Sequence, residues 1–373
     1  MRLLGDRFFV LIVIVLVAGG LAMFFSASLG LLARENASVT HIFATQLILG
    51  LIPGIIALFI LRFIPSKLIA KGTLPFYIAC LILTVLVFVP HIGVHANGAS
   101  RWLNLGFTTF QPAEFLKIGT ILMLGGYLAY ARGKIAYLRS GLVPFLAIVG
   151  VPVLLLLLQP NTSTVIVLGI TCTVMYILAG APWRDLGILA LIALIGVMGL
   201  VFTRPYLRDR VTTFLHPTSD ASYSSGYQIQ QSLIAIGSGG ILGRGFGQSV
   251  QKFNYLPEAV DDSVFAVFAE EFGFIGAIAL IIVFAGFAAR GFRIASEAST
   301  AAGAYIAAGL TLMIVLSAFL NIGAMLGVLP LTGLPLPFVS HGGTALFTAL
   351  AAVGIILNIA STRRKMKGDT SHF

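Results

Sequence analysis

The sequence predicts an all-α, polytopic membrane protein, and three observations support this prediction. The mean hydropathy is +1.02 over 373 residues. Hydrophobic residues make up 58% of the chain and charged residues only 10%. The apolar residues recur in runs close to the length that a helix needs to cross about 30 Å of hydrocarbon. We therefore expect a single integral-membrane domain over residues 1–373.

A hydropathy window of about 19 residues predicts about ten membrane-crossing helices. They are expected at residues 8–28, 42–61, 73–90, 112–131, 141–158, 164–180, 186–203, 264–289, 302–322 and 342–360. The first run is long for a signal peptide and is followed at once by further apolar chain, so we keep it as a span. Cys80 and Cys172 lie inside apolar runs, where buried thiols are expected.

The basic residues of the connections predict how the helices are oriented. With a cytoplasmic N-terminus, 15 of the 23 Lys and Arg residues fall on inner connections and 7 on outer ones. This bias places both termini in the cytoplasm, including a tail at residues 361–373. The net charge of +10 then suits the anionic lipid of the inner leaflet, and nucleic-acid binding is not expected.

A large outer loop is predicted between the seventh and eighth helices, at about residues 204–263. Connections of this length are usually functional or disordered. Residues 227–236 place apolar side chains between glutamines, which suits an interfacial amphipathic helix. The glycines at 237–247 allow either tight turns and close backbone approach or simple loop flexibility.

Acidic residues gather at the end of this loop, where five of the 13 carboxylates lie within fourteen positions. The five are Glu258, Asp261, Asp262, Glu270 and Glu271. We interpret this segment as an active site at a membrane surface. Because charge at membrane depth must be paired or face a polar cavity, Glu270 and Glu271 could instead be structural partners of a basic residue on another helix.

A second charged group is expected at the outer start of the fourth helix. Glu114 and Lys117 are three positions apart and so share one helix face. Two roles fit this spacing: an ion pair that holds helices together, or a part of the site.

Several separate motifs, in order along the chain, carry a resemblance to a known family. They are Arg101-Trp-Leu-Asn-Leu-Gly106, Gln111-Pro-Ala-Glu114-Phe-Leu-Lys117, Gln159-Pro160, Tyr227-Gln228, Gln231-Ser232, Tyr255-Leu-Pro-Glu258, Ala269-Glu270-Glu271-Phe-Gly273, and Pro330-Leu-Thr-Gly333 with Pro337-Phe-Val-Ser340-His-Gly-Gly343. Together they resemble the FtsW/RodA/SpoVE family, the SEDS proteins of bacterial shape, elongation, division and sporulation. The segment Gly247-Gln-Ser249-Val-Gln-Lys252 is more similar to the division branch, FtsW, than to the elongation branch.

The resemblance implies a peptidoglycan glycosyltransferase that polymerises lipid II, an undecaprenyl-pyrophosphate-linked disaccharide peptide, at the outer face of the bacterial cytoplasmic membrane. The family's essential aspartate falls on Asp262, and its basic partners fall on Arg101 and Lys117. Further substrate contacts are expected from Glu114, Gln111, Gln228 and Ser340, with Glu258, Asp261, Glu270 and Glu271 in support. The implied partners are a class B penicillin-binding transpeptidase and other membrane proteins of the divisome or elongasome.

Three positions depart from the family's usual pattern. Val260-Asp261 stands where His-Thr is common, Asn161 where Asp is common, and His341 where Tyr is common. These departures bear on details of the site and leave the fold unaffected.

The residue types fit this chemistry independently of the resemblance. Glycan extension needs a general base for the attacking hydroxyl and cations for the departing pyrophosphate. Asp262 can be the base, and Arg101 and Lys117 can face the phosphates. Asp261 and Asp262 could together hold Mg²⁺ or Mn²⁺, since hard cations take oxygen ligands. Asp262 is equally a plausible N-cap for the eighth helix.

Two other functions stay open at this point. A lipid II flippase or other transporter would also have many spans and intramembrane charges, although the acids lie on one face and no internal repeat is evident. A protein that only recruits division partners through helix packing is the third possibility.

Overall fold

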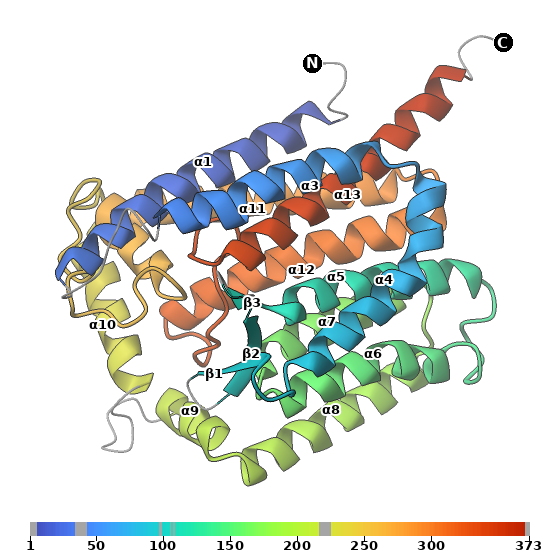
Figure 1. The fold of residues 1–373 in the computed structure, drawn as a ribbon, viewed down its shortest axis with the longest axis horizontal. Helices are drawn as coiled ribbons and strands as arrows, with labels where there is room; N and C mark the ends of the chain where they lie inside the picture. Colours follow the sequence, from blue (N-terminus) through green and yellow to red (C-terminus); the bar gives the residue numbers. More distant parts are fainter. Residues whose placement is uncertain are drawn as a thin grey trace.

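The computed structural model describes residues 6–33, 43–96, 99–104, 106, 109–215 and 225–369, and these form a bundle of long helices with a small sheet and two short helices at one end (Figure 1). The helices are α1 Arg7–Leu29, η2 Gly30–Ala33, η3 Gln46–Leu51, α3 Ile52–Phe63, α4 Ser66–Leu86, α5 Pro112–Tyr130, α6 Leu142–Leu158, α7 Thr162–Leu178, α8 Trp183–Thr203, α9 Pro205–Leu215, α10 Ser225–Ser238, α11 Val264–Ser296, α12 Ala301–Met325 and α13 Gly343–Asp369.

Helices long and apolar enough to cross a membrane account for seven candidate spans among the described residues. They are Arg7–Leu29, Phe43–Phe63, Ser66–Leu86, Trp183–Thr203, Val264–Ser296, Ala301–Met325 and Gly343–Thr362. Shorter apolar helices, α6 and α7, fill two more predicted positions, and α5 fills the remaining one. The all-α, polytopic prediction is therefore confirmed in outline, while the number of helices that cross the membrane stays a prediction.

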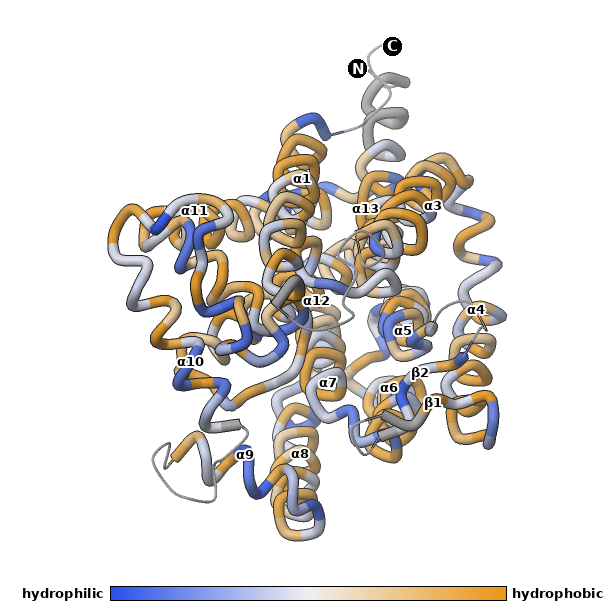
Figure 2. Tube along the Cα trace, turned by 60° about the vertical axis from the view of Figure 1, so that its left-hand side comes forward, coloured by the Kyte–Doolittle hydropathy of each residue, from blue (hydrophilic) through white to orange (hydrophobic). Residues whose placement is uncertain are grey.

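Burial differs strongly along the bundle. α12 lies at its centre, with 67% of its most apolar window buried, whereas the same measure for α8 is 0%. Within α8 only Asp185 is buried, and its carboxylate accepts a hydrogen bond of 2.7 Å from Tyr176. Figure 2 shows α8 largely in apolar colours, as expected for a helix whose apolar surface faces lipid.

Four features of the fold differ from the sequence prediction. A three-stranded antiparallel sheet in the order β1-β2-β3 precedes α5, with β1 at Gly93–Ala96, β2 at Ala99–Asn104 and β3 at Thr109–Phe110. α4 begins at Ser66, seven residues before the predicted start. α13 continues to Asp369, through most of the predicted tail. The eighth helix, α11, is broken at Gly273, where φ is 65°.

Contacts between helix ends define the end of the bundle opposite to the sheet. Arg290 of α11 pairs with Asp6, at the start of α1, at 2.6 Å. Asn358 of α13 donates hydrogen bonds to the carbonyls of Arg62 and Ile64, at the end of α3. Each of these ends is one that the charge bias assigns to the cytoplasm.

Candidate active site

The start of α5 brings Glu114 and Lys117 to a buried position. Pro112 at the first turn has a φ suited to a helix start, and a carboxylate there is favoured by the helix dipole. Gln111 occupies the N-cap position, but its side chain makes no capping hydrogen bond. The ammonium of Lys117 lies 2.8 Å from the carboxylate of Glu114, which also accepts a hydrogen bond from Thr348 at 3.2 Å.

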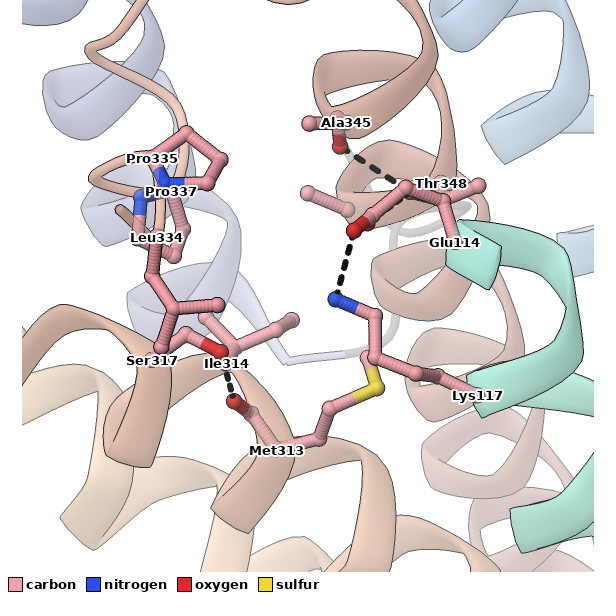
Figure 3. Close-up of a pocket in the computed structure, with 11 residues that line it drawn as sticks. Glu114, Lys117, Met313, Ile314, Ser317, Leu334, Pro335, Pro337, Ala345 and Thr348 are labelled. Carbon is pink, nitrogen blue, oxygen red and sulfur yellow. Dashed lines mark hydrogen bonds and ion pairs between the residues drawn. The ribbon is translucent and has the colours of Figure 1, made fainter. Parts of the chain in front are cut away.

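A small cavity of about 30 Å³ borders this ion pair. In Figure 3, Glu114 and Lys117 face the chain that carries Leu334, Pro335 and Pro337 across the cavity. A volume of this size holds one or two waters and excludes a pyrophosphate. In the structure as it stands, Lys117 is an ion-pair partner, so phosphate contact would require this region to open.

Arg101 projects from β2 toward the turn between α6 and α7. Its guanidinium donates to the carbonyl of Gln159 at 3.3 Å and to that of Pro160 at 2.5 Å. Burial lowers the pKa of Arg101, the nearby Tyr206 opposes this shift, and the positive charge of Arg210 adds to it. A second arginine therefore lies close to Arg101.

Arg210 of α9 is the functional candidate that sequence analysis missed. It donates to the carbonyl of Thr332 at 3.4 Å and lies against the ring of Tyr206. A Cβ built on Gly333 would be 3.7 Å from the Arg210 guanidinium and 3.8 Å from Asp262 Oδ2. The signal available in the sequence was an arginine in the outer loop, but only the fold places it beside Asp262.

Asp262 is held by residues of two different helices. Its Oδ1 accepts a hydrogen bond of 2.9 Å from the Gln228 amide of α10. Its backbone carbonyl accepts one of 2.7 Å from Asn321 of α12. The same Asn321 amide binds the carbonyl of Leu334, so the aspartate and the chain beside the Lys117 cavity share one anchor.

The surroundings of Asp262 raise its pKa from 3.8 to about 6. Burial is the main cause, and the negative charge of Asp261 adds to the rise. The hydrogen bond from Gln228 and the positive charge of Arg210 oppose it. A carboxylate with this pKa is charged at neutral pH and accepts a proton more readily than an ordinary aspartate.

Asp262 does not cap the helix that follows it, so the capping interpretation is wrong. α11 begins at Val264, and Ser263 is its N-cap residue, with no capping hydrogen bond from its side chain. A tight turn precedes the helix, because the Glu258 carbonyl accepts from the amides of Asp261 and Ser263. Glu258 has a φ of 50° in this turn, and its side chain is exposed.

Asp261 lies against a different partner from Asp262. Its Oδ1 is 3.1 Å from Nδ1 of His341. The two residues line a cavity of about 210 Å³, together with Glu258 and Lys252. The expected pair of adjacent carboxylates is therefore divided between two surroundings.

Ser340 belongs to the internal structure of its loop. Its hydroxyl accepts a hydrogen bond of 2.8 Å from the Leu336 amide, and only 6% of the residue is exposed. The Gln46 side chain contacts the carbonyl of Ser340 at 3.4 Å and the amide of Gly342 at 3.1 Å. In this arrangement Ser340 shapes the loop and presents little surface to a substrate.

Glu270 and Glu271 hold the glycine-rich segment of the outer loop against α11. Glu271 pairs with Lys252 at 2.8 Å, and both side chains are fully buried. Glu270 accepts hydrogen bonds from Ser249 and from the amides of Val250 and Gln251. The interpretation as structural partners of basic residues fits. Those residues, Lys252 for Glu271 and Arg244 for Glu270, lie in the loop and not on another helix.

Comparisons with known proteins place this architecture in one family. The chain matches the family FTSW_RODA_SPOVE, described as cell cycle protein, over residues 6–365. The chain belongs to the FtsW/RodA/SpoVE family. Among its relatives, Stage V sporulation protein E of Bacillus subtilis (strain 168) is 38% identical over 359 residues, which cover 96% of this chain and 98% of the relative.

Two further matches support membership of the FtsW/RodA/SpoVE family. A protein of Geobacter sp. (strain M18) named "Probable peptidoglycan glycosyltransferase FtsW" is 34% identical over 359 residues, with 96% of this chain and 97% of the relative covered. A solved structure, described as structural coordination of polymerization and crosslinking by a peptidoglycan synthase complex, is 30% identical with a TM-score of 0.76. That match covers 96% of this chain and 98% of the solved chain.

The residues predicted for a family member fall into three groups in this structure. Asp262, Gln228 and Arg101 gather at the end of the bundle that carries the sheet, and Arg210 joins them. Lys117 and Glu114 line the small cavity next to Leu334. Glu270 and Glu271 bind the glycine-rich segment of the outer loop. Asn161, one of the departures, is buried beside the Arg101 contacts, and its amide nitrogen has no hydrogen-bond partner among the described residues.

Proposed function

We propose that this protein is a peptidoglycan glycosyltransferase that polymerises lipid II, with Asp262 as the general base. One observation carries the proposal. The Asp262 carboxylate, whose pKa is raised to about 6, and the Arg210 guanidinium both lie next to Gly333. Family membership and the names of the relatives support the same activity.

The reaction follows from this arrangement. A sugar hydroxyl of the acceptor attacks the anomeric carbon of the donor, and the proton of that hydroxyl passes to a carboxylate oxygen of Asp262. The bond between the anomeric carbon and the lipid pyrophosphate breaks, and its electron pair leaves with the pyrophosphate. General base catalysis of this kind contributes on the order of 10² to 10⁴ in rate.

The arginines would stabilise the departing pyrophosphate. Arg101 and Arg210 are held by backbone carbonyls of the Pro160 turn and of Thr332, so they are positioned before substrate binds. A guanidinium can contact two phosphate oxygens at once, which makes arginine well suited to this role. In this proposal Lys117 contributes only when the chain around Leu334 moves.

A divalent cation, Mg²⁺ or Mn²⁺, is part of the proposal. Among the described residues no group of three His, Cys, Asp or Glu side chains could hold a metal ion. Mg²⁺ often uses one or two carboxylates and takes its other ligands from substrate phosphates and water, so Asp262 would hold the ion with the lipid pyrophosphate. The ion would neutralise phosphate charge. Loss of activity with a chelator, and recovery with added Mg²⁺ or Mn²⁺, would test this.

Membrane orientation and partners complete the proposal. The clustering of the predicted inner ends around Arg290 and Asn358 supports cytoplasmic termini in a bacterial cytoplasmic membrane. Single cysteines at Asp209 and Ser296, with Cys80 and Cys172 replaced, test this with a membrane-impermeant reagent. Labelling at 296 but not 209 in intact cells would invert the topology.

A class B penicillin-binding transpeptidase is the proposed partner, since the solved relative belongs to a complex that coordinates polymerization and crosslinking. Other divisome or elongasome proteins are further candidates.

The decisive experiment supplies purified protein, with and without a transpeptidase partner, with lipid II in liposomes. We expect glycan chains from the parent protein and about 10² to 10⁴-fold slower polymerisation from Asp262→Ala. Transfer of lipid II between leaflets without any polymer would favour the flippase alternative and overturn the proposal.

A further inference from the structure

The Asp261 and His341 side chains form a contact that the proposed reaction does not use. The two residues are far apart in the sequence, and both stand where the chain departs from the usual family pattern. Their side chains meet at 3.1 Å, between Asp261 Oδ1 and His341 Nδ1. Each side chain is partly exposed, at 41% and 36% respectively, so neither is needed to fill the core.

His341 is held from several directions at once. Its amide donates to the carbonyl of Val260 at 2.8 Å, and its ring stacks on Phe24 of α1 at 5.5 Å between centroids. The side chain of Gln46, in the π-helical turn η3, hydrogen-bonds to Ser340 and Gly342, the residues on either side of His341. His341 therefore joins α1, η3 and the chain segment that carries Asp262.

Asp262 itself is bound by two other helices, whereas the residues that precede it are held by His341. Gln228 binds its carboxylate, and Asn321 binds its carbonyl. On the preceding side the chain turns tightly at Glu258, and Val260 and Asp261 both contact His341. Movement at His341 would thus shift Asp262 through two adjacent peptide units.

We propose that Asp261 and His341 form a positioning pair that fixes Asp262 for proton transfer. The inference rests on the proposed function, because it assigns a role to Asp262. A displacement of about 1 Å in a reacting group can cost on the order of 100-fold in rate, whereas a partly exposed hydrogen bond between two side chains adds little to stability. Loss of the contact should therefore lower turnover and leave folding largely intact.

The test measures lipid II polymerisation and thermal unfolding for a set of full-length variants. His341→Phe keeps an aromatic ring for Phe24 and the backbone contact to Val260, but removes Nδ1. Asp261→Leu removes the carboxylate with little change in size. The double variant measures coupling, and the exchange Asp261→His with His341→Asp rebuilds the pair in reverse. Asp209→Asn removes an exposed acid from α9 and serves as the charge control.

We expect each single variant to lose about 10-fold or more in kcat, within the range that misplacement produces, with KM and unfolding temperature unchanged. The double variant should be no worse than either single variant, and the exchanged pair should regain most of the loss. Parental kcat in the single variants, losses that multiply in the double variant, or an exchanged pair that regains nothing would each overturn the inference. Inactivity of the parent protein itself would instead contradict the proposed function, so the two failures are distinguishable.

Discussion

Asp262 and Glu271 are acids nine positions apart, but their carboxylates have very different surroundings in the structure. Glu271 is fully buried against Lys252 at 2.8 Å and also accepts hydrogen bonds from Ser26 and the Gly247 amide. The Asp262 carboxylate accepts one hydrogen bond from Gln228, with a longer contact of 3.5 Å from Ser263. Its pKa is raised to about 6.

The difference separates a structural carboxylate from a reactive one. Hydrogen bonds and an opposite charge favour the ionised form and hold it in place. Glu271 has both, so it fixes the outer loop to α11. Asp262 is buried with fewer compensating contacts, which leaves its charge poorly satisfied and its oxygen able to take a proton.

The largest expected effect is on Asp262 itself. Asp262→Ala should reduce polymerisation by about 10² to 10⁴-fold, because the acceptor hydroxyl loses its base. The unfolding temperature should stay close to that of the parent protein. A variant that still elongates glycan at the parental rate would contradict the assignment.

Glu271→Ala should act on stability. Removing it leaves the Lys252 ammonium buried without its counter-charge, which costs about 3–5 kcal/mol in the free energy of unfolding. Arg244→Ala is the matched control, since it removes a partly exposed partner of Glu270 and should cost about 0–1 kcal/mol. Equal unfolding free energies for the two variants would show that Glu271 is not structural.

Gly243→Ala tests how the outer loop docks next to Glu271. Gly243 has a φ of 83°, and an added Cβ would lie 2.2 Å from the Glu271 carbonyl. We expect a loss of about 1–3 kcal/mol in the free energy of unfolding. Gly237→Ala, at a site in α10 with open space, should be neutral or stabilise by up to about 1 kcal/mol.

Lys117→Met separates the two roles proposed for the α5 ion pair. Because Glu114 retains its hydrogen bond from Thr348, the loss in the free energy of unfolding should be about 1–3 kcal/mol. Adding Glu114→Gln should restore part of it. If instead the single variant keeps its stability and turnover falls, Lys117 acts in catalysis; normal turnover in a folded variant would exclude that role.

The pH dependence gives the smallest and most specific effect. As the pH falls below about 6, Asp262 gains a proton, and the rate should drop about tenfold per pH unit. The folded state raises the pKa of Asp262 from 3.8 to about 6. Between these two pH values the folded protein therefore binds more protons than the unfolded chain. Stability contributed by the group therefore falls as the pH rises through that window, and Asp262→Asn should remove this fall. A rate that stays flat down to pH 5 would contradict Asp262 as base.

Much of the fold was predictable because hydrophobic length and charge bias are local properties of the chain. Every predicted span overlaps helical structure in the described residues, and the amphipathic segment at 227–236 lies within α10. The break at Gly273 was not predicted. There the helix opens so that the amides of Phe274 and Ile275 bind the carbonyls of Gly240 and Ile241, a contact between distant segments that no local pattern encodes.

The sequence by itself determined the membrane class, the family and the candidate base, since each depends on composition or on residues close together in the chain. Only the tertiary structure decided which acids are free to react. It paired Glu271 with Lys252, placed Arg210 beside Asp262, and turned Asp261 toward His341. The physical reason is that the pKa and the reactivity of a carboxylate depend on burial and on neighbouring charges, and those neighbours come from other helices and loops.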